Sequence, residues 1–420
     1  MDNTNVLKIN KLWNKNFFLL WQGQLVSCLG DAFYSMALGF WVLDKTGSSS
    51  IMGILMATVS LPRIILGPFA GVLVDRFDRK KLILIGDFIR GIGMLFIGYA
   101  AYNNFLEVWM VMIVGIICGI CSAFFNPAIS SVVPDLVPSD DLVKANSAQE
   151  GATSTIHLIG SMSGGFIYSI LGPPLMFIFN GVSYILSMIS EVFIEVPKVK
   201  RSNTKLTYRE DFKEGISFTF GFRGLVILLS LDLIANFLYA IFFILLRPWF
   251  LLDESLGISR YGFLAAFDSM GIMVASILIT KIDIKCENRS NVTLVALVLQ
   301  SVFLLIGVIT NDFYIMCICF FIGGFFNAIY NSISSAAIVL ATPQNMRGKV
   351  MSIVMTFSIA IFPIGALVGG ILGDILNPRN VIIVCFTICI ITSIPVVFSK
   401  SVKKVLNYNP ETQTLEDIKG

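Results

Sequence analysis

The feature that most constrains this chain is a series of twelve long apolar runs. Each run is close to the ~20 residues that a helix rising ~1.5 Å per residue needs to cross ~30 Å of hydrocarbon. The runs are continuous rather than alternating, which favours lipid-embedded helices over the strands of a membrane barrel. They lie at about 17–41, 51–74, 82–101, 106–127, 151–171, 175–196, 224–246, 260–280, 291–310, 313–336, 349–373 and 380–398.

Composition and charge placement agree with an all-α membrane protein that crosses the bilayer many times. Charged residues make up 14% of the chain, whereas a soluble domain has roughly 25%. With the N-terminus in the cytoplasm, the cytoplasmic segments hold 24 Lys and Arg residues and the opposite loops hold four. This asymmetry, with the even number of spans, predicts that both termini lie in the cytoplasm. The eight cysteines form no disulfide or metal pattern, and no metal, cofactor or nucleic-acid partner is expected.

The twelve runs divide into two related halves. The predicted parts are 1–196, a cytoplasmic loop 197–223 with an amphipathic segment, 224–400, and a cytoplasmic tail 401–420. "CSAFFNPAISS" in span four resembles "GGFFNAIYNSISS" in span ten, and "GSMSGGFIYSILG" in span five resembles "GALVGGILGDIL" in span eleven, at offsets of 201 and 205 residues. Duplicated six-helix halves predict a secondary transporter with its substrate site between them, near the bilayer midplane.

Glycines recur at helical spacing in the two related segments of spans five and eleven. Small residues four apart allow helix backbones to approach closely, so these glycines predict packing or hinge positions. Generic helix packing is the alternative for each one alone. The residues are Gly160, Gly164, Gly165, Gly365, Gly369 and Gly370.

A dense charge block follows span two in "GPFAGVLVDRFDRKK", residues 67–81. Gly71 and Asp75 are four residues apart and share one helical stripe. The glycine would admit a neighbouring helix, and the carboxylate could accept hydrogen bonds from the N-terminus of a helix. The block therefore predicts a gate on the cytoplasmic side, although its basic residues could instead only set the topology. The gate would include Gly71, Asp75, Arg76, Asp78, Arg79 and Lys80.

"GVLVDRFDRKK" closely resembles the loop signature of the major facilitator superfamily, Gly-x-x-x-Asp-Arg-x-Gly-Arg-Lys, with Asp78 in place of the glycine. This variant, together with "VWMVMIV" and "FFNPA", resembles the subgroup that holds bacterial macrolide efflux proteins and related drug:proton antiporters. The resemblance implies the major facilitator fold of twelve helices in two pseudo-symmetric halves. It also implies that Gly71 and Asp75 meet the cytoplasmic end of span eleven.

Two departures from the exporter pattern concern proton coupling. "GSMSGG" in span five resembles the antiporter signature Gly-Pro-x-x-Gly-Gly, with Ser161 in place of proline. Many exporters of the family carry an arginine in span four, where this chain has Cys118 and no basic residue. Any coupling must therefore use other groups.

Ionisable residues within the spans are the candidates for proton coupling or substrate binding, because charges are costly in a bilayer. Asp31 and Asp268 come from opposite halves and are expected at comparable depth. Either carboxyl could exchange a proton or meet a cationic drug amine, or a pair with Arg63 could simply hold helices together. The candidates are Asp31, Arg63, Asp232, Asp268 and His157.

For three groups a structural role is expected or is the alternative. Asp87 and Arg90, three residues apart, are expected to form a pair near the charge block. His157 could relay protons, with hydrogen bonding as the alternative. Glu191 is expected at the cytoplasmic interface.

The leading interpretation is a monomeric exporter of drugs, such as macrolides or tetracyclines, that works by proton antiport and alternating access. Within transporters, the alternatives are export of a siderophore or another metabolite, or import of a nutrient. An enzyme or ATP-driven pump is disfavoured because "MRGKVMS" lacks the phosphate-binding loop. A channel or receptor would show no accumulation against a gradient.

Overall fold

The computed structural model describes residues 11–74, 77–138, 141–196, 208–253, 255–279, 282, 284–310, 312–343, 346–409 and 412–418. This part of the chain is helical. The elements are α1 (Lys15–Thr46), α2 (Ser49–Val74), α3 (Arg79–Tyr102), α4 (Val108–Leu136), α5 (Leu142–Val192), α6 (Tyr208–Phe220), α7 (Arg223–Leu252), α8 (Gly257–Ile279), α9 (Cys286–Thr310), α10 (Phe313–Leu340), α11 (Arg347–Ile375), α12 (Pro378–Val397), α13 (Lys400–Leu406) and the 3₁₀ turn η2 (Leu415–Ile418).

Eleven helices in the described residues are long and apolar enough to cross a membrane. These eleven helices account for all twelve predicted spans because one helix, α5, contains both span five and span six. Its backbone is non-helical at Gly172, where φ is +69°, and Pro173 and Pro174 follow. Glycine tolerates this left-handed conformation and the prolines remove backbone donors, so the chain bends here between the two spans.

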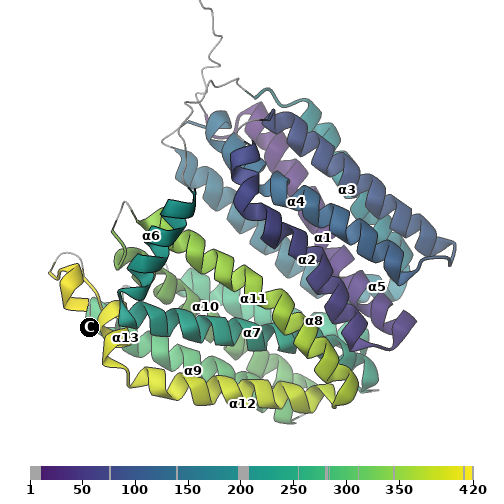
Figure 1. The fold of residues 1–420 in the computed structure, drawn as a ribbon. Helices are drawn as coiled ribbons and strands as arrows, with labels where there is room; N and C mark the ends of the chain where they lie inside the picture. The colour runs from purple at the N-terminus through teal and green to yellow at the C-terminus, as the bar shows by residue number, and fades with distance from the viewer. Residues whose placement is uncertain are drawn as a thin grey trace, which may run out of the picture. The chain divides into compact units, whose positions relative to one another are not determined.

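The chain divides into two compact units, Met1–Gly47 with Leu55–Asn203 (unit 1) and Ser48–Ile54 with Thr204–Gly420 (unit 2). In unit 1, α5 packs against α1 and α3, and α3 packs against α4. One end of this unit has a closed apolar core formed by residues such as Phe17, Phe125 and Leu136. The helices of unit 1 can be followed as the purple-to-blue ribbons of Figure 1.

In unit 2, α10 packs against α8 and α9, while α7 packs against α11 and α12. Its largest apolar core joins residues of α7, α9 and α10 to α13, including Leu225, Leu297 and Val405. The amphipathic segment predicted in the central loop contains α6, which packs on α11 and α7.

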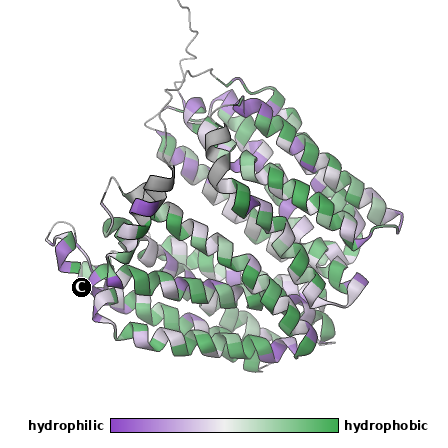
Figure 2. Ribbon diagram, viewed as in Figure 1, coloured by the Kyte–Doolittle hydropathy of each residue, from purple (hydrophilic) through white to green (hydrophobic). Residues whose placement is uncertain are grey.

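Figure 2 shows that apolar residues predominate along the length of the helices, and many large apolar side chains of both units are exposed. Ile170, Leu252 and Ile375 are 62%, 71% and 72% exposed. A protein surrounded by water would not leave so many such residues uncovered. The helices therefore present these faces to lipid, and the chain is a multi-pass membrane protein.

The glycines predicted from the repeat lie at close helix contacts. Gly160 and Gly164 face Ala32 and Met36 of α1, and a Cβ atom on Gly164 would lie 3.2 Å from Met36 Cε. In unit 2, a Cβ atom on Gly365 would lie 2.6 Å from a carbonyl oxygen of α7, and one on Gly369 would lie 2.9 Å from Ile241 Cα. Gly165 and Gly370 are also buried. The first and fifth helices of each repeat thus approach at glycines.

Candidate functional site

A buried polar network joins α1, α3 and α5 in unit 1. Asp31 of α1 is at one end of it. The hydroxyl of Tyr184 donates to Asp31 Oδ1 at 2.5 Å, and the amide of Asn180 lies 3.4 Å from the same oxygen. Asn180 and Tyr184 are one turn apart on α5, so both side chains reach the same helix.

Arg90 of α3 lies at the centre of this network. Its guanidinium forms an ion pair with Asp87 and stacks on the rings of Phe125 and Tyr184, 3.9 Å and 4.5 Å from their centroids. Asp87 is fully buried and Arg90 is 6% exposed. The predicted pair of Asp87 and Arg90 exists, but it belongs to the interior of unit 1 rather than to the charge block. Buried charges are tolerated only with such partners.

Glu191 of α5 forms the other end of the network. It is 1% exposed, so its side chain faces the interior of unit 1, and its expected position at the cytoplasmic interface stays a prediction. Its Oε1 accepts hydrogen bonds from Gln24 at 2.9 Å and from Ser187 at 3.4 Å. Asp87 lies within hydrogen-bonding reach of Glu191, and the second oxygens of both carboxyls, Asp87 Oδ2 and Glu191 Oε2, are buried without a donor.

Among the described residues, Asp87 and Glu191 share one guanidinium, that of Arg90. If both carboxyls were ionised, one negative charge would lack a partner away from water, which is costly. A proton between Asp87 and Glu191 would satisfy both unpartnered oxygens, because two neighbouring carboxyls cannot both ionise easily. The arrangement is therefore suited to bind and release protons.

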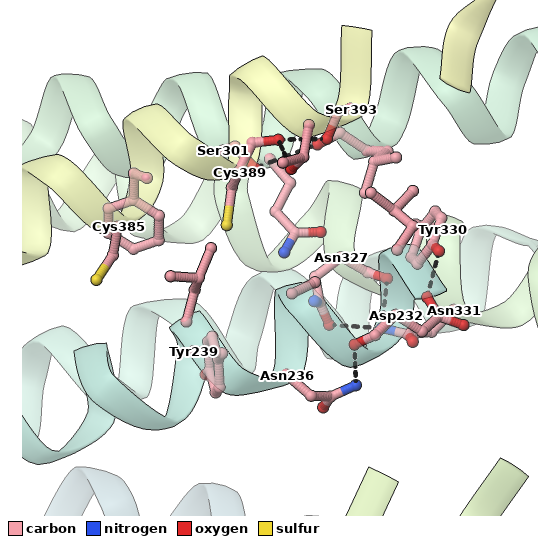
Figure 3. Close-up of a pocket in the computed structure, with 17 residues that line it drawn as sticks. Asp232, Asn236, Tyr239, Ser301, Asn327, Tyr330, Asn331, Cys385, Cys389 and Ser393 are labelled. Carbon is pink, nitrogen blue, oxygen red and sulfur yellow. Dashed lines mark hydrogen bonds between the residues drawn. The ribbon is translucent and has the colours of Figure 1, made fainter. Parts of the chain in front are cut away.

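Unit 2 contains a polar cavity of about 230 Å³ bounded by α7, α9, α10 and α12 (Figure 3). Asp232 of α7 is the one carboxyl among the described residues of its lining, and Tyr330 of α10 donates a hydrogen bond to Asp232 Oδ1. In the described part of the chain, no cluster of three or more His, Cys, Asp or Glu side chains could hold a metal ion.

Asp232 is the repeat counterpart of Asp31. The two aspartates are 201 residues apart, which is the offset that also relates "FFN" at 124–126 to "FFN" at 325–327. Each aspartate lies on the first helix of its half and accepts a hydrogen bond from a tyrosine. Asp268, which was expected to match Asp31, lies on α8, outside the lining of the cavity and against Gly324 of α10.

Two other candidates contribute to neither polar site in what the structure describes. Arg63 lies on α2 with an exposed side chain. His157 lies in α5, but its side chain is outside the described part of the chain. Their proposed roles in coupling or binding stay predictions.

The charge block after α2 is described in part. Asp75 and Arg76 lie outside the described residues, and Gly71 lies in α2. Asp78 caps the start of α3 by accepting from the Lys81 amide. Arg79 pairs with Asp135 of α4 at 2.9 Å, and Lys80 donates to the Val192 carbonyl at the end of α5 at 2.7 Å. Arg79 and Lys80 thus hold helix ends of unit 1 together, and their role in a gate stays a prediction.

Asp374, near the end of α11, is a polar contact that sequence reasoning missed. It accepts hydrogen bonds from the amides of Ser49 and Ser50 at 2.5 Å and 3.1 Å and from the Ser48 hydroxyl at 2.6 Å. It caps the first turn of α2. The signal was present: Gly370 and Asp374 have the same spacing as Gly71 and Asp75.

The chain is similar to known proteins over most of its length. A family model described as a transmembrane secretion effector matches residues 8–413. Macrolide efflux protein A of Streptococcus pyogenes is 24% identical over 402 residues, which cover 94% of this chain and 98% of that protein. Multidrug efflux pump Tap of Mycobacterium bovis (strain BCG / Pasteur 1173P2) is 22% identical over 369 residues, 85% of this chain and 87% of that protein.

A solved structure has the same fold. It is that of a bacterial homologue of the human lysosomal transporter Spinster, in an inward-facing and unoccupied conformation. It matches with a TM-score of 0.70 at 12% identity and covers 94% of this chain and 98% of that one.

Proposed function

The chain belongs to the transmembrane secretion effector family of the major facilitator superfamily, and we propose that it exports drugs from the bacterial cytoplasm in exchange for protons. The family and fold predicted from the sequence are confirmed: the protein is a membrane transporter and not an enzyme. Macrolides are the first substrates to test, since a relative named for macrolide efflux aligns over nearly its whole length. We place both termini in the cytoplasm, as the basic loops predict.

The observation that carries proton coupling is the charge count of the network in unit 1. Among the described residues, Asp87 and Glu191 face a single guanidinium, that of Arg90. The ion pair keeps Asp87 ionised, and Glu191 holds a proton that Asp87 Oδ2 accepts. This proton supplies the donor that both buried oxygens lack.

Asp31 is the proposed exchange point for a second proton. Its carboxylate is stabilised by the Tyr184 hydroxyl, and the ring of Tyr184 also supports the Arg90 guanidinium. Protonation of Asp31 removes a negative charge from this end of the network and weakens its attraction for a cationic drug. Proton uptake and drug release are then linked through the same electrostatic balance.

Alternating access requires contacts that break between states. The three hydrogen bonds from Ser48, Ser49 and Ser50 to Asp374 form one such contact within unit 2. We propose that α2 leaves Asp374 in one state of the cycle, and that the block around Gly71 and Asp75 closes the cytoplasmic side in that state.

The test of this function is drug/proton exchange in everted membrane vesicles. Respiration acidifies the lumen, and the addition of erythromycin, tetracycline or ethidium should release protons when the chain is present. Glu191→Gln should abolish the release, whereas vesicles with Asp312→Asn, a cap on α10, should keep it. No release with any drug, at wild-type protein abundance, would reject drug antiport and direct the search to metabolites such as siderophores.

A further inference from the structure

The cavity beside Asp232 in unit 2 has an uncompensated acid. The described residues that line it include no Lys, Arg or His, and Asp232 is the one carboxyl among them. Oδ1 of Asp232 accepts from the Tyr330 hydroxyl, while no donor within the described residues reaches Oδ2. This contrasts with Asp31, whose tyrosine partner also contacts an arginine. An anionic pocket without a counterion attracts a cation.

Several side chains of the remaining polar lining keep a free acceptor while at least one of their donors is already in use. The Asn236 amide donates to the Asp232 carbonyl at 2.8 Å, and the Asn331 amide donates to Asn327 at 3.0 Å. Hydroxyls on α9 and α12 donate to carbonyls of their own helices, which leaves their oxygens as acceptors. These hydroxyls belong to Ser301, Thr392 and Ser393.

Gln300 adds an unmet acceptor to the same lining. Its Oε1 is buried and has no hydrogen-bond partner. A buried carbonyl oxygen without a donor is unfavourable and is satisfied by a bound group. A ligand with a positive charge and an N–H or O–H donor would satisfy both Asp232 and Gln300.

The size and the aromatic lining favour an organic cation over a bare metal ion. A volume of about 230 Å³ holds several heavy atoms, since one water occupies about 30 Å³. Tyr239, Tyr330 and Phe386 lie around the cavity, and aromatic rings favour ammonium groups through cation–π attraction. Asp232, Tyr239 and Tyr330 appear together in Figure 3.

We propose that this pocket in unit 2 binds the ammonium group of a small organic cation, with Asp232 as its counterion and Gln300 as a hydrogen-bond acceptor. The site lies within one unit and is separate from the network around Arg90. Binding of a cation at this site is therefore independent of whether the chain exports drugs.

The test is calorimetric titration of the purified full-length protein in detergent and potassium HEPES. Choline chloride is the probe, 3,3-dimethyl-1-butanol is its neutral isostere, and sodium chloride is the inorganic cation. Choline should bind and the alcohol should not. Asp232→Asn should weaken choline binding at least about tenfold, because a charge-assisted contact is lost. Asp312→Asn, which removes a carboxyl that caps α10 outside this lining, should bind choline like the wild type.

Several outcomes would overturn the proposal. Equal binding of choline and the alcohol would indicate an apolar cavity. Sodium binding that depends on Asp232, without choline binding, would assign the pocket to an inorganic cation. If Asp232→Asn does not fold, Gln300→Leu is tested in its place. Gln300→Leu should weaken choline binding. Unchanged binding in a folded Gln300→Leu protein would reject the site.

Discussion

The Tyr184 hydroxyl on α5 donates a hydrogen bond to Asp31 on α1 at 2.5 Å. The Tyr330 hydroxyl on α10 donates a hydrogen bond to Asp232 on α7. The two aspartates are repeat counterparts, but the two surroundings differ. The ring of Tyr184 lies against the Arg90 guanidinium, 4.5 Å away, whereas the described residues that line the cavity beside Asp232 include no basic side chain. One aspartate is thus linked to an arginine through its tyrosine, and the other lies beside a cavity.

Replacing Arg90 should lower the stability of the protein because the buried acids around it lose their positive partner. Arg90→Ala leaves Asp87 buried without its ion-pair partner, and the loss of one partner from a buried pair costs about 3–5 kcal/mol of unfolding free energy. We expect a lower melting temperature in detergent and no proton exchange in vesicles.

The double variant Asp87→Asn with Arg90→Gln separates stability from coupling. It removes both charges together, so most of the melting temperature should return while proton exchange stays absent. Recovery of exchange along with stability would mean that the pair is only structural.

Glu191→Gln should uncouple the transporter without unfolding it. The glutamine oxygen can still accept from Gln24, and its amide can donate to Asp87 Oδ2, which lacks a donor in the wild type. The unfolding free energy should change by no more than about 1 kcal/mol, while drug-induced proton release disappears. Gln24→Leu is the matched control because it removes a hydrogen bond but no ionisable group. Normal exchange in Glu191→Gln would exclude this carboxyl as a proton carrier.

Asp374→Ala should alter transport through α2. It removes a cap from the first turn of α2, worth about 0.5–2 kcal/mol, and releases that turn from α11. The exporter should then change its drug-transport rate as well as its melting temperature.

Asp312→Ala is the control for this cap. Asp312 caps its own helix, α10, through the amides of Tyr314 and Ile315. Its loss should lower the melting temperature to a similar extent and leave the transport rate unchanged. Equal effects of the two variants on transport would show that Asp374 is an ordinary cap.

Gly365→Ala should disturb the contact between α7 and α11. The new methyl would lie 2.6 Å from the Phe237 carbonyl oxygen and 2.7 Å from Ala240 Cβ. Such overpacking costs about 1–3 kcal/mol and should reduce transport. Gly67→Ala on α2 meets no atom within 4 Å, so the better helix propensity of alanine should leave the protein as stable or more so. The two melting curves check this contrast directly.

The sequence by itself determined the class, the fold and the family. Twelve apolar runs are readable because hydrocarbon requires each span to be long, apolar and hydrogen-bonded within itself. The loop signature and the repeat at 201 residues identified the superfamily, and the same offset relates Asp31 to Asp232. The match between Asp31 and Asp232 can be found without a structure, although the expected depth within the spans relates Asp31 to Asp268 instead.

Only the tertiary structure decided which polar groups meet. Asp87 and Arg90 are adjacent on one helix, but Glu191 and Tyr184 reach them from α5, about a hundred residues later. Hydropathy cannot predict this, because lipid and helix contacts are both apolar and leave the rotation of each helix undefined. The same ambiguity hid the burial of Glu191 and the capping of α2 by Asp374, which depend on how helices distant in sequence pack.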